Sequence, residues 1–292
     1  MITKFARLLL FQKMNKLVNS NPQYFLHNGS LKTISEFNDN IISGEKVIYE
    51  VIKISDSAPI FLNEHLSRMR QSIELSKLKN IDLNSLRKSI KELLHINPIQ
   101  QQNIKLIASY KTENAQPNIT AFFIPSKYPS TDDKINGVYV KTISATRNNP
   151  EVKAENKILR TYADEVIANN LCYEVLMING TGQITEGSRS NVFFVANKKL
   201  YTAPLNLVLG GITRLKVIDI CNKLNIDTVQ ECLNKEQLTD IDGAFITGTS
   251  PGVLAINKID NIELNVNIDL IKQISTEYNT LVQNEINCWK LV

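Results

Sequence analysis

The sequence predicts an α/β (α+β) protein of two domains, and three observations support this. Segments rich in β-branched and aromatic residues alternate with segments whose apolar residues recur at helical spacing. A stretch rich in proline, serine and aspartate, 126–133, interrupts this alternation. A chain of 292 residues is long enough for two modest hydrophobic cores. We therefore expect an N-terminal extension at 1–23, a small α/β domain at 24–128 and a larger domain at 134–292.

Four segments of the first domain have the composition of strands: 24–27, 46–54, 103–110 and 118–125. The last two are separated by a short polar segment and are expected to form a hairpin. Two helices are expected to begin near Asn63 and Asn84, since each asparagine precedes apolar residues at helical spacing. An asparagine side chain can accept a hydrogen bond from the first turn of a helix, so both residues are expected N-caps.

Six segments of the second domain are predicted strands: 137–143, 174–178, 183–185, 191–195, 242–247 and 252–256. The sequence Asn-Gly-Thr-Gly at 179–182 indicates a hairpin turn between two of them. Helices are expected at 156–170, 212–224 and 270–284. In the first of these, we expect one face to be formed by Ile158, Tyr162, Val166 and Ile167.

The segment 1–23 contains four basic residues and no acidic residue, and part of it is apolar. A signal peptide, an amphipathic helix and a transit-like helix are alternatives. No small-x-small cleavage site follows the short apolar run, however. We interpret the segment as an N-terminal extension or the result of a start codon placed too far upstream, because chain termini are poorly constrained.

Composition narrows the class of protein further. The net charge is only +4 and no Lys/Arg-rich run is interleaved with aromatic residues, so we expect no nucleic-acid partner. No run of eighteen apolar residues is present, so we expect no membrane span. The three histidines and four cysteines are scattered, which argues against a metal site. Reduced thiols in a cytoplasmic setting are the simplest interpretation of the cysteines.

Three motifs suggest a specific chemistry. Lys153-Ala-Glu-Asn is followed about thirty residues later by Thr-Glu-Gly-Ser, with Glu186 at its centre, and then by Gly-Ile-Thr-Arg at 211–214. These motifs resemble those of class IV pyridoxal 5'-phosphate (PLP) aminotransferases, which have fold type IV. The resemblance extends from Tyr24 to about Asp260. It implies a small α/β domain and a larger domain with a mixed, β-barrel-like core.

The resemblance implies a role for two residues in the chemistry. Lys153 matches the lysine that forms a Schiff base with PLP, and Asn156 follows it at the family's spacing. Such a lysine must be neutral to attack, so burial and neighbouring cations should lower its pKa. Nearby Lys157 is the competing candidate. Glu186 matches the glutamate that pairs with the pyridine nitrogen and favours its protonated form.

The cofactor phosphate needs hydrogen-bond donors, and a helix N-terminus is a suitable source of them. The resemblance assigns this role to the backbone amides of Ile212 and Thr213, which open a predicted helix. It also assigns the hydroxyl of Thr249 and the guanidinium of Arg68 to the phosphate. Arginine suits a phosphate because its forked donors are charged. The alternative for Arg68 is a solvated helix face.

The substrate side is less well defined. Tyr49 matches a tyrosine that lines the substrate side in the family's aminotransferases, and a core aromatic is the alternative. Ser250 occupies a position of the family's substrate carboxylate site, but Pro251 follows it and has no N–H to donate. The strand 104–110 lacks the arginine that binds the substrate carboxylate in D-amino-acid transaminases. The resemblance therefore does not identify the substrate.

Taken with the motifs, the resemblance implies transamination between an amino acid and a 2-oxo acid through the lysine Schiff base. The alternative is a lyase of the 4-amino-4-deoxychorismate type, which shares the scaffold and releases pyruvate. Such lyases often have threonine after the strand aromatic, where this chain has Glu50, so transamination is favoured. A related protein that no longer acts as an enzyme is a third alternative. The resemblance also implies a homodimer.

Overall fold

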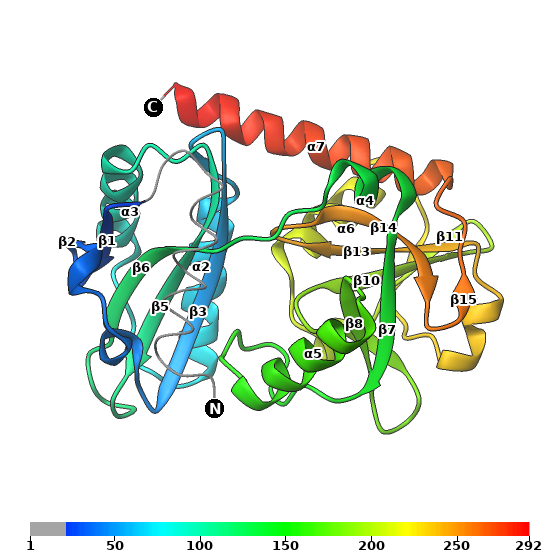
Figure 1. Cartoon of the computed structure of the whole chain (residues 1–292), viewed down its shortest axis with the longest axis horizontal. Coiled ribbons are helices and arrows are strands. Elements are labelled where there is room, and N and C mark those ends of the chain that lie inside the picture. Colours follow the sequence, from blue (N-terminus) through cyan, green and yellow to red (C-terminus); the bar gives the residue numbers. More distant parts are fainter. Residues whose placement is uncertain (1–21, 292) are drawn as a thin grey trace. The chain divides into compact units, whose positions relative to one another are not determined.

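A computed structural model of the protein describes residues 22–291, and almost all of the expected extension, 1–23, lies outside this range. The chain divides into two compact units (Figure 1). Unit 1 contains the residues up to Lys127 together with Glu285–Val292, and unit 2 is Tyr128–Asn284. The division falls within the expected linker, 126–133. The last residues differ from the expectation, which had placed all of 134–292 in one domain.

Unit 1 is built on an antiparallel sheet with the strand order β2-β1-β6-β5-β3-β4. The strands are β1 (Tyr24–His27), β2 (Ser30–Thr33), β3 (Lys46–Ser55), β4 (Ala58–Pro59), β5 (Gln101–Tyr110) and β6 (Asn118–Ile124). Alternate residues of β3 are buried, as expected for a strand whose two faces have different surroundings. Helix α2 (Leu62–Leu75) lies along β3, and α3 (Leu83–Ile96) lies beside β1 (Figure 1).

The two helices of unit 1 begin differently from the expectation. Asp82, not Asn84, is the N-cap of α3, and its side chain accepts hydrogen bonds from the N–H groups of Asn84 and Ser85. Helix α2 begins at Leu62, after Phe61 in a left-handed conformation with φ of 54°, and no side chain caps it. The prediction of Asn63 as an N-cap is therefore wrong. Phe61 and Leu62 are both buried, so the start of α2 lies in the core.

Unit 2 contains a nine-stranded sheet, six strands of which close into a barrel. The barrel strands are β7 (Val138–Ser144), β8 (Glu174–Ile178), β9 (Ile184–Gly187), β10 (Asn191–Ala196), β13 (Gly243–Gly248) and β14 (Gly252–Ile259). Closure depends on a short pairing of β9 with β10, at Glu186 and Asn191. Strand β7 is parallel to both of its neighbours, and the other barrel pairings are antiparallel.

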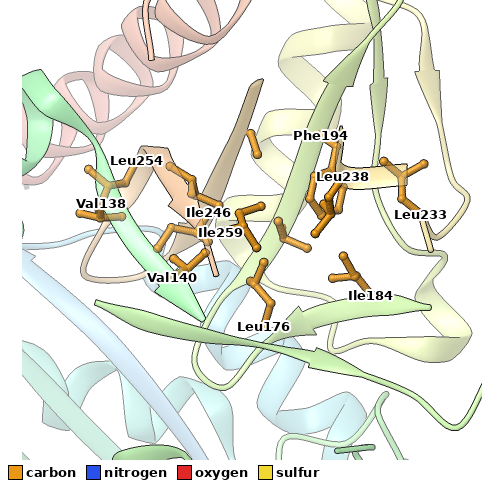
Figure 2. Packing of buried hydrophobic residues seen from close by; sticks show 13 residues of the cluster. Val138, Val140, Leu176, Ile184, Phe194, Leu233, Leu238, Ile246, Leu254 and Ile259 are labelled. Atoms are coloured by element: carbon orange, nitrogen blue, oxygen red, sulfur yellow. The ribbon is translucent and has the colours of Figure 1, made fainter. Parts of the chain in front are cut away.

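Aliphatic side chains fill the interior of the barrel, as Figure 2 shows for the cluster that includes Val140, Leu176, Ile246 and Ile259. Strand β10 is buried on both faces. Val192 and Phe194 belong to this interior cluster, whereas Phe193 belongs to a second cluster with residues of α6 (Ile212–Lys223) and α7 (Asp269–Lys290). The ends of the barrel strands, where the polar residues lie, are therefore held on a rigid core.

Helix α5 (Lys157–Asn170) begins one residue after the expected start, and only Val166 and Ile167 of the four residues expected on one face pack in the core. The side chains of Ile158 and Tyr162 are 87% and 44% exposed. Leu159, Ala163, Val166 and Ile167 pack against β7 and β8 instead. These four residues also follow helical spacing, so the pattern alone did not distinguish the two overlapping faces.

The remaining elements of unit 2 are short: α4 (Thr131–Asn136), β11 (Lys199–Tyr201), β12 (Thr228–Val229) and β15 (Ile262–Glu263). Within residues 22–291, none of the helices has both the length and the apolar character needed to cross a bilayer. In the same range, no group of three or more His, Cys, Asp or Glu side chains is placed to hold a metal ion.

Candidate active site

Glu186 is buried at the end of β9, and polar groups surround its carboxylate. Oε1 accepts a hydrogen bond from Nε of Arg147 at 2.6 Å. Oε2 accepts one from the backbone N–H of Leu209 at 3.1 Å and lies 3.5 Å from Nδ2 of Asn191. These contacts bring the loop after β7 and the loop before α6 to the same carboxylate.

Burial raises the pKa of Glu186 above its ordinary value, because a carboxylate loses its hydration in the protein interior. The charge and hydrogen bond of Arg147, the N–H of Leu209 and the charge of Lys153 all lower it, but they offset only part of the effect of burial. One further cation or N–H donor beside this carboxylate would favour its charged form. A protonated pyridine ring is such a group.

Lys153 is half-buried in the segment that joins β7 to α5. Its charge is close enough to Glu186 to lower the pKa of that carboxyl. The competing candidate, Lys157, is different: its side chain is 85% exposed, and its ammonium lies 4.0 Å from Glu155. Of the two lysines, Lys153 is therefore the one that the structure associates with Glu186.

Helix α6 begins after Gly211, and no side chain caps its N-terminus. A Cβ atom at Gly211 would lie 2.2 Å from Oδ1 of Asn191, so a larger residue at this position would have to displace the Asn191 side chain. Ile212 and Thr213 form the first turn, where the N–H groups of a helix are available to an anion. Asn191 also donates a hydrogen bond to the carbonyl of Leu209 at 2.9 Å, which joins this loop to the barrel.

A third polar group lies on β13. Thr247 is the direct partner of Asn191 across the sheet, and Asn191 is the partner of Glu186. The hydroxyl of Thr247 is buried and has no hydrogen-bond partner in the structure. Thr249 and Ser250 follow in the turn between β13 and β14, and both are half-buried.

These residues fit PLP. Glu186 is a buried carboxylate suited to a ring N–H, and Lys153 is an amine near it. The uncapped N-terminus of α6 suits a phosphate, and the hydroxyl of Thr247 is a buried polar atom that still requires a partner. In unit 2, Glu186 is thus linked to Lys153 through its charge and to the loop before α6 through the N–H of Leu209.

The other two predicted site residues lie in unit 1. Glu50 of β3 accepts hydrogen bonds from Arg68 of α2, at 2.8 Å from Nε and 2.6 Å from Nη2, and lies 2.7 Å from Nδ1 of His65. Burial alone would raise the pKa of Glu50, but the charge of Arg68 and the hydrogen bonds from Arg68 and His65 outweigh it and lower the pKa to about 2. Arg68 is thus held within the core of its unit, not on a solvated helix face. Its contact with a phosphate stays a prediction.

Tyr49 precedes Glu50 and lies on the opposite face of β3, because side chains alternate along a strand. It is half-buried and packs beside Phe25 and Phe122, with the ammonium of Lys105 at 5.1 Å from its ring centroid. This partial burial agrees with either a core aromatic or a substrate contact, and the substrate role stays a prediction.

Sequence reasoning did not identify Arg147 or Asn191 as functional residues. Arg147 lies in a polar loop without periodicity, and only its contact with Glu186 reveals it. A signal was available for Asn191, because it ends the specific string Thr-Glu-Gly-Ser-Arg-Ser-Asn. Its side chain connects Glu186 to the loop before α6.

The barrel of unit 2 carries an amine, a buried carboxylate and an uncapped helix N-terminus, which are groups that suit the binding of PLP. The chain belongs to the amino-transferase class IV family, whose model matches residues 47–259. The aminotransferases of this family depend on PLP, which agrees with the residues found at the site.

A D-alanine aminotransferase of Bacillus licheniformis is 28% identical over 224 residues, which are 73% of this chain and 78% of that protein. The structure of a branched-chain aminotransferase from Thermoproteus uzoniensis has a TM-score of 0.81 and 23% identity, covering 91% of this chain and 96% of that one. The structure of a putative branched-chain amino acid aminotransferase from Thermotoga maritima has a TM-score of 0.75 and 24% identity, covering 89% of this chain and 96% of that one. The two structures share the fold type IV architecture of this chain.

Proposed function

We propose that this protein transfers an amino group between an amino acid and a 2-oxo acid, with Lys153 as the amine that bonds to PLP. The observation that supports this most strongly is the proximity of Lys153 and Glu186, with Arg147 bound to the same carboxylate. The family match supports transamination in general. The assignment of Lys153 is our own step.

Bound PLP supplies an electron sink that stabilises negative charge at the Cα of the amino acid. Glu186 would hold the proton on the pyridine nitrogen of bound PLP, and Arg147 orients Glu186 through Oε1. With PLP bound, Lys153 would act as the general base for the Cα proton of the amino acid. A lysine serves this role when its amine is neutral.

The phosphate of PLP is proposed to bind at the first turn of α6, through the N–H groups of Ile212 and Thr213. The missing side-chain cap and the close approach of Asn191 to Gly211 support this assignment. Thr249 is proposed to contribute its hydroxyl from the turn after β13. Tyr49 and Ser250 are proposed to contact the substrate.

Relatives differ in substrate: one is named for D-alanine, and the similar structures are named for branched-chain amino acids. Pro251 removes one backbone N–H from the turn that begins at Thr249. Ser250 and Pro251 therefore cannot hold a substrate carboxylate through two successive N–H groups. A panel of D- and L-amino acids with several 2-oxo acids would identify the donor and acceptor.

The test is borohydride reduction of the protein with PLP, followed by peptide mapping. We expect the label on the peptide at Lys153. The Lys153→Ala variant should lose label and lower kcat by about 10²–10⁴-fold, a typical contribution of a general base. Lys157→Ala, four residues away on an exposed side chain, is the matched control and should keep both. Label on Lys157, or pyruvate release from aminodeoxychorismate without an oxo acid, would contradict the proposal.

We also propose a homodimer in the cytoplasm. Cys172, Cys221, Cys232 and Cys288 are all free, which agrees with a reducing compartment. Light scattering coupled to size-exclusion chromatography, at several protein concentrations, would test the dimer. A mass of one chain, 33.0 kDa, at every concentration would contradict it.

A further inference from the structure

We propose that Glu174 is a positioning residue: its carboxylate holds the turn 187–190, and this turn sets Glu186 opposite Asn191. The inference rests on the proposed function of Glu186 and adds a residue that acts on it. Glu174 is the first residue of β8 and is buried. It lies twelve positions before Glu186 in the chain. Its effect on Glu186 is transmitted by the turn.

Four donors converge on the Glu174 carboxylate. Oε1 accepts from the N–H of Val175 at 2.8 Å and the hydroxyl of Ser188 at 2.7 Å. Oε2 accepts from the N–H of Arg189 at 3.1 Å and the hydroxyl of Ser190 at 3.0 Å. Three of these donors belong to the single turn between β9 and β10. All four are uncharged, so the arrangement is a scaffold for backbone and hydroxyl groups and not an ion pair.

The four donors around Glu174 require a side chain that accepts hydrogen bonds at both of its terminal atoms, and a carboxylate does so. It accepts hydrogen bonds at both oxygens, whereas an amide of the same shape accepts at one and donates at the other. A glutamine at this position would direct its NH2 group at one backbone N–H and one hydroxyl, so the N–H would lose its acceptor and the hydroxyl would have to turn from donor to acceptor. The loss would fall on the turn itself, because Ser188, Arg189 and Ser190 supply three of the four donors.

The turn is packed closely on Glu174. The N–H of Gly187 donates to the carbonyl of Ser190 at 2.7 Å, and the N–H of Ser188 donates to the carbonyl of Val175 at 3.1 Å. A Cβ atom at Gly187 would lie 2.0 Å from Oγ of Ser190 and 3.2 Å from Cγ of Glu174. A larger residue at Gly187 would have to displace the Ser190 hydroxyl and press against Glu174.

The turn determines where the two strands meet. Glu186 immediately precedes it and Asn191 immediately follows it, and these two residues are the register pair that joins β9 to β10. The same pair closes the barrel and holds Asn191 near Oε2 of Glu186. A displaced turn would therefore move Glu186 relative to Arg147 and Leu209. Misplacement of a catalytic group by about 1 Å can cost about 100-fold in rate.

Hydrogen exchange of the cofactor-free protein tests the positioning role directly. In Glu174→Gln, amides of the turn 187–190 should exchange at least roughly tenfold faster, which corresponds to loss of one buried hydrogen bond. Amides of β13 should be unchanged. The matched control is Glu263→Gln, the same chemical change at an exposed carboxylate that pairs with Lys258 at 2.7 Å. No change in the turn, or equal acceleration throughout unit 2, would overturn the proposal.

A second readout uses the PLP-bound protein. If Glu186 is displaced, the pyridine nitrogen loses its proton more easily. The lysine–cofactor chromophore then keeps its own proton to higher pH, and the pH midpoint of its absorbance rises. We expect this upward shift in Glu174→Gln, together with a kcat about 100-fold lower and a nearly unchanged KM. An unshifted midpoint with a lower kcat would overturn the proposal.

If Glu174→Gln does not fold, Ser190→Ala decides the question, since it removes one donor to Oε2 and leaves Glu174 in place. The exchange and the pH midpoint should then change in the same directions by smaller amounts, and no change would overturn the proposal. The outcomes also separate the two proposals. Wild-type protein that takes up no PLP would contradict the proposed function, whereas the exchange result depends only on the cofactor-free chain.

Discussion

At the scale of single residues, Glu186 serves the proposed function but lowers the stability of the cofactor-free fold at neutral pH. In the cofactor-free protein, burial raises its pKa above 4.5, despite the Arg147 charge and hydrogen bonds. A carboxyl whose pKa rises on folding stabilises the folded state below its unfolded pKa. That stabilisation is lost as the pH rises through the folded pKa. Glu186 in the cofactor-free protein therefore destabilises it at neutral pH, as is common for residues selected for function.

The Glu186→Gln substitution removes this titration. We expect the cofactor-free variant to have a higher free energy of unfolding than wild type at neutral pH, and the difference to disappear as the pH falls to about 4.5. Its aminotransferase rate should fall about 100-fold or more, because an electrostatic contact with the reacting system is lost. Urea unfolding at several pH values measures the first effect, with Glu263→Gln as a control that should lack it. A less stable variant at neutral pH would contradict the argument.

Some of these residues could be found in the sequence and others could not. Lys153 and Glu186 lie in strings whose chemistry is specific, so they were predicted. Arg147 and Glu174 act through contacts with residues 39 and 14–16 positions away, and no local pattern marks such pairs. Glu174 appeared in the sequence only as the first residue of an apolar strand. The role of Glu174 could be inferred only from the structure, which places its carboxylate against the turn that follows Glu186.

At the scale of elements, the sequence prediction and the structure differ on the N-cap of α3, which was expected to be Asn84 and is Asp82. The side chain of Asp82 accepts hydrogen bonds from the N–H of Asn84 at 2.9 Å, the N–H of Ser85 at 3.3 Å and the Ser85 hydroxyl at 2.6 Å. Asp82→Ala should therefore lower the free energy of unfolding, and Asn84→Ala, the matched control, should leave it nearly unchanged. Chemical denaturation of both variants measures this. An effect of Asn84→Ala as large as that of Asp82→Ala would restore the original prediction.

The pH dependence provides a second check on the same cap. Hydrogen bonds from the Ser85 hydroxyl, the Ser85 N–H and the Asn84 N–H lower the pKa of Asp82 below 3.8. A carboxyl with a lowered folded pKa stabilises the fold above its unfolded pKa, and this contribution is lost as the pH falls through the folded value. The difference between Asp82→Ala and wild type should therefore shrink below about pH 3.8.

Strands with strong composition were predicted almost to the residue, including β1 and β8. The two-residue strands β4, β12 and β15 were not, because so short a segment has no period to detect. Helix α5 was located to within one residue, but only half of its predicted face, Val166 and Ile167, is packed. Apolar side chains of α5 point in several directions around the helix axis, and the positions of β7 and β8 determine which of them are packed. Local pattern thus predicted the elements better than their packing.

At the scale of the whole molecule, the site residues of unit 2 lie on loops joined to one closed barrel, so cofactor binding should stabilise that barrel as a unit. A ligand that binds only the folded state stabilises it by about 2.7 kcal/mol at 100 times its dissociation constant. We expect PLP to slow the exchange of β9, β10 and β13 amides in the whole chain by about 100-fold at that concentration. Hydrogen exchange measured with and without PLP tests this.

Lys153→Ala should show a smaller effect of PLP on exchange, since the covalent bond is lost, and Lys157→Ala should match wild type. Equal protection in Lys153→Ala and wild type would mean that the amine contributes nothing to retention of the cofactor, and the assignment of Lys153 would then be wrong.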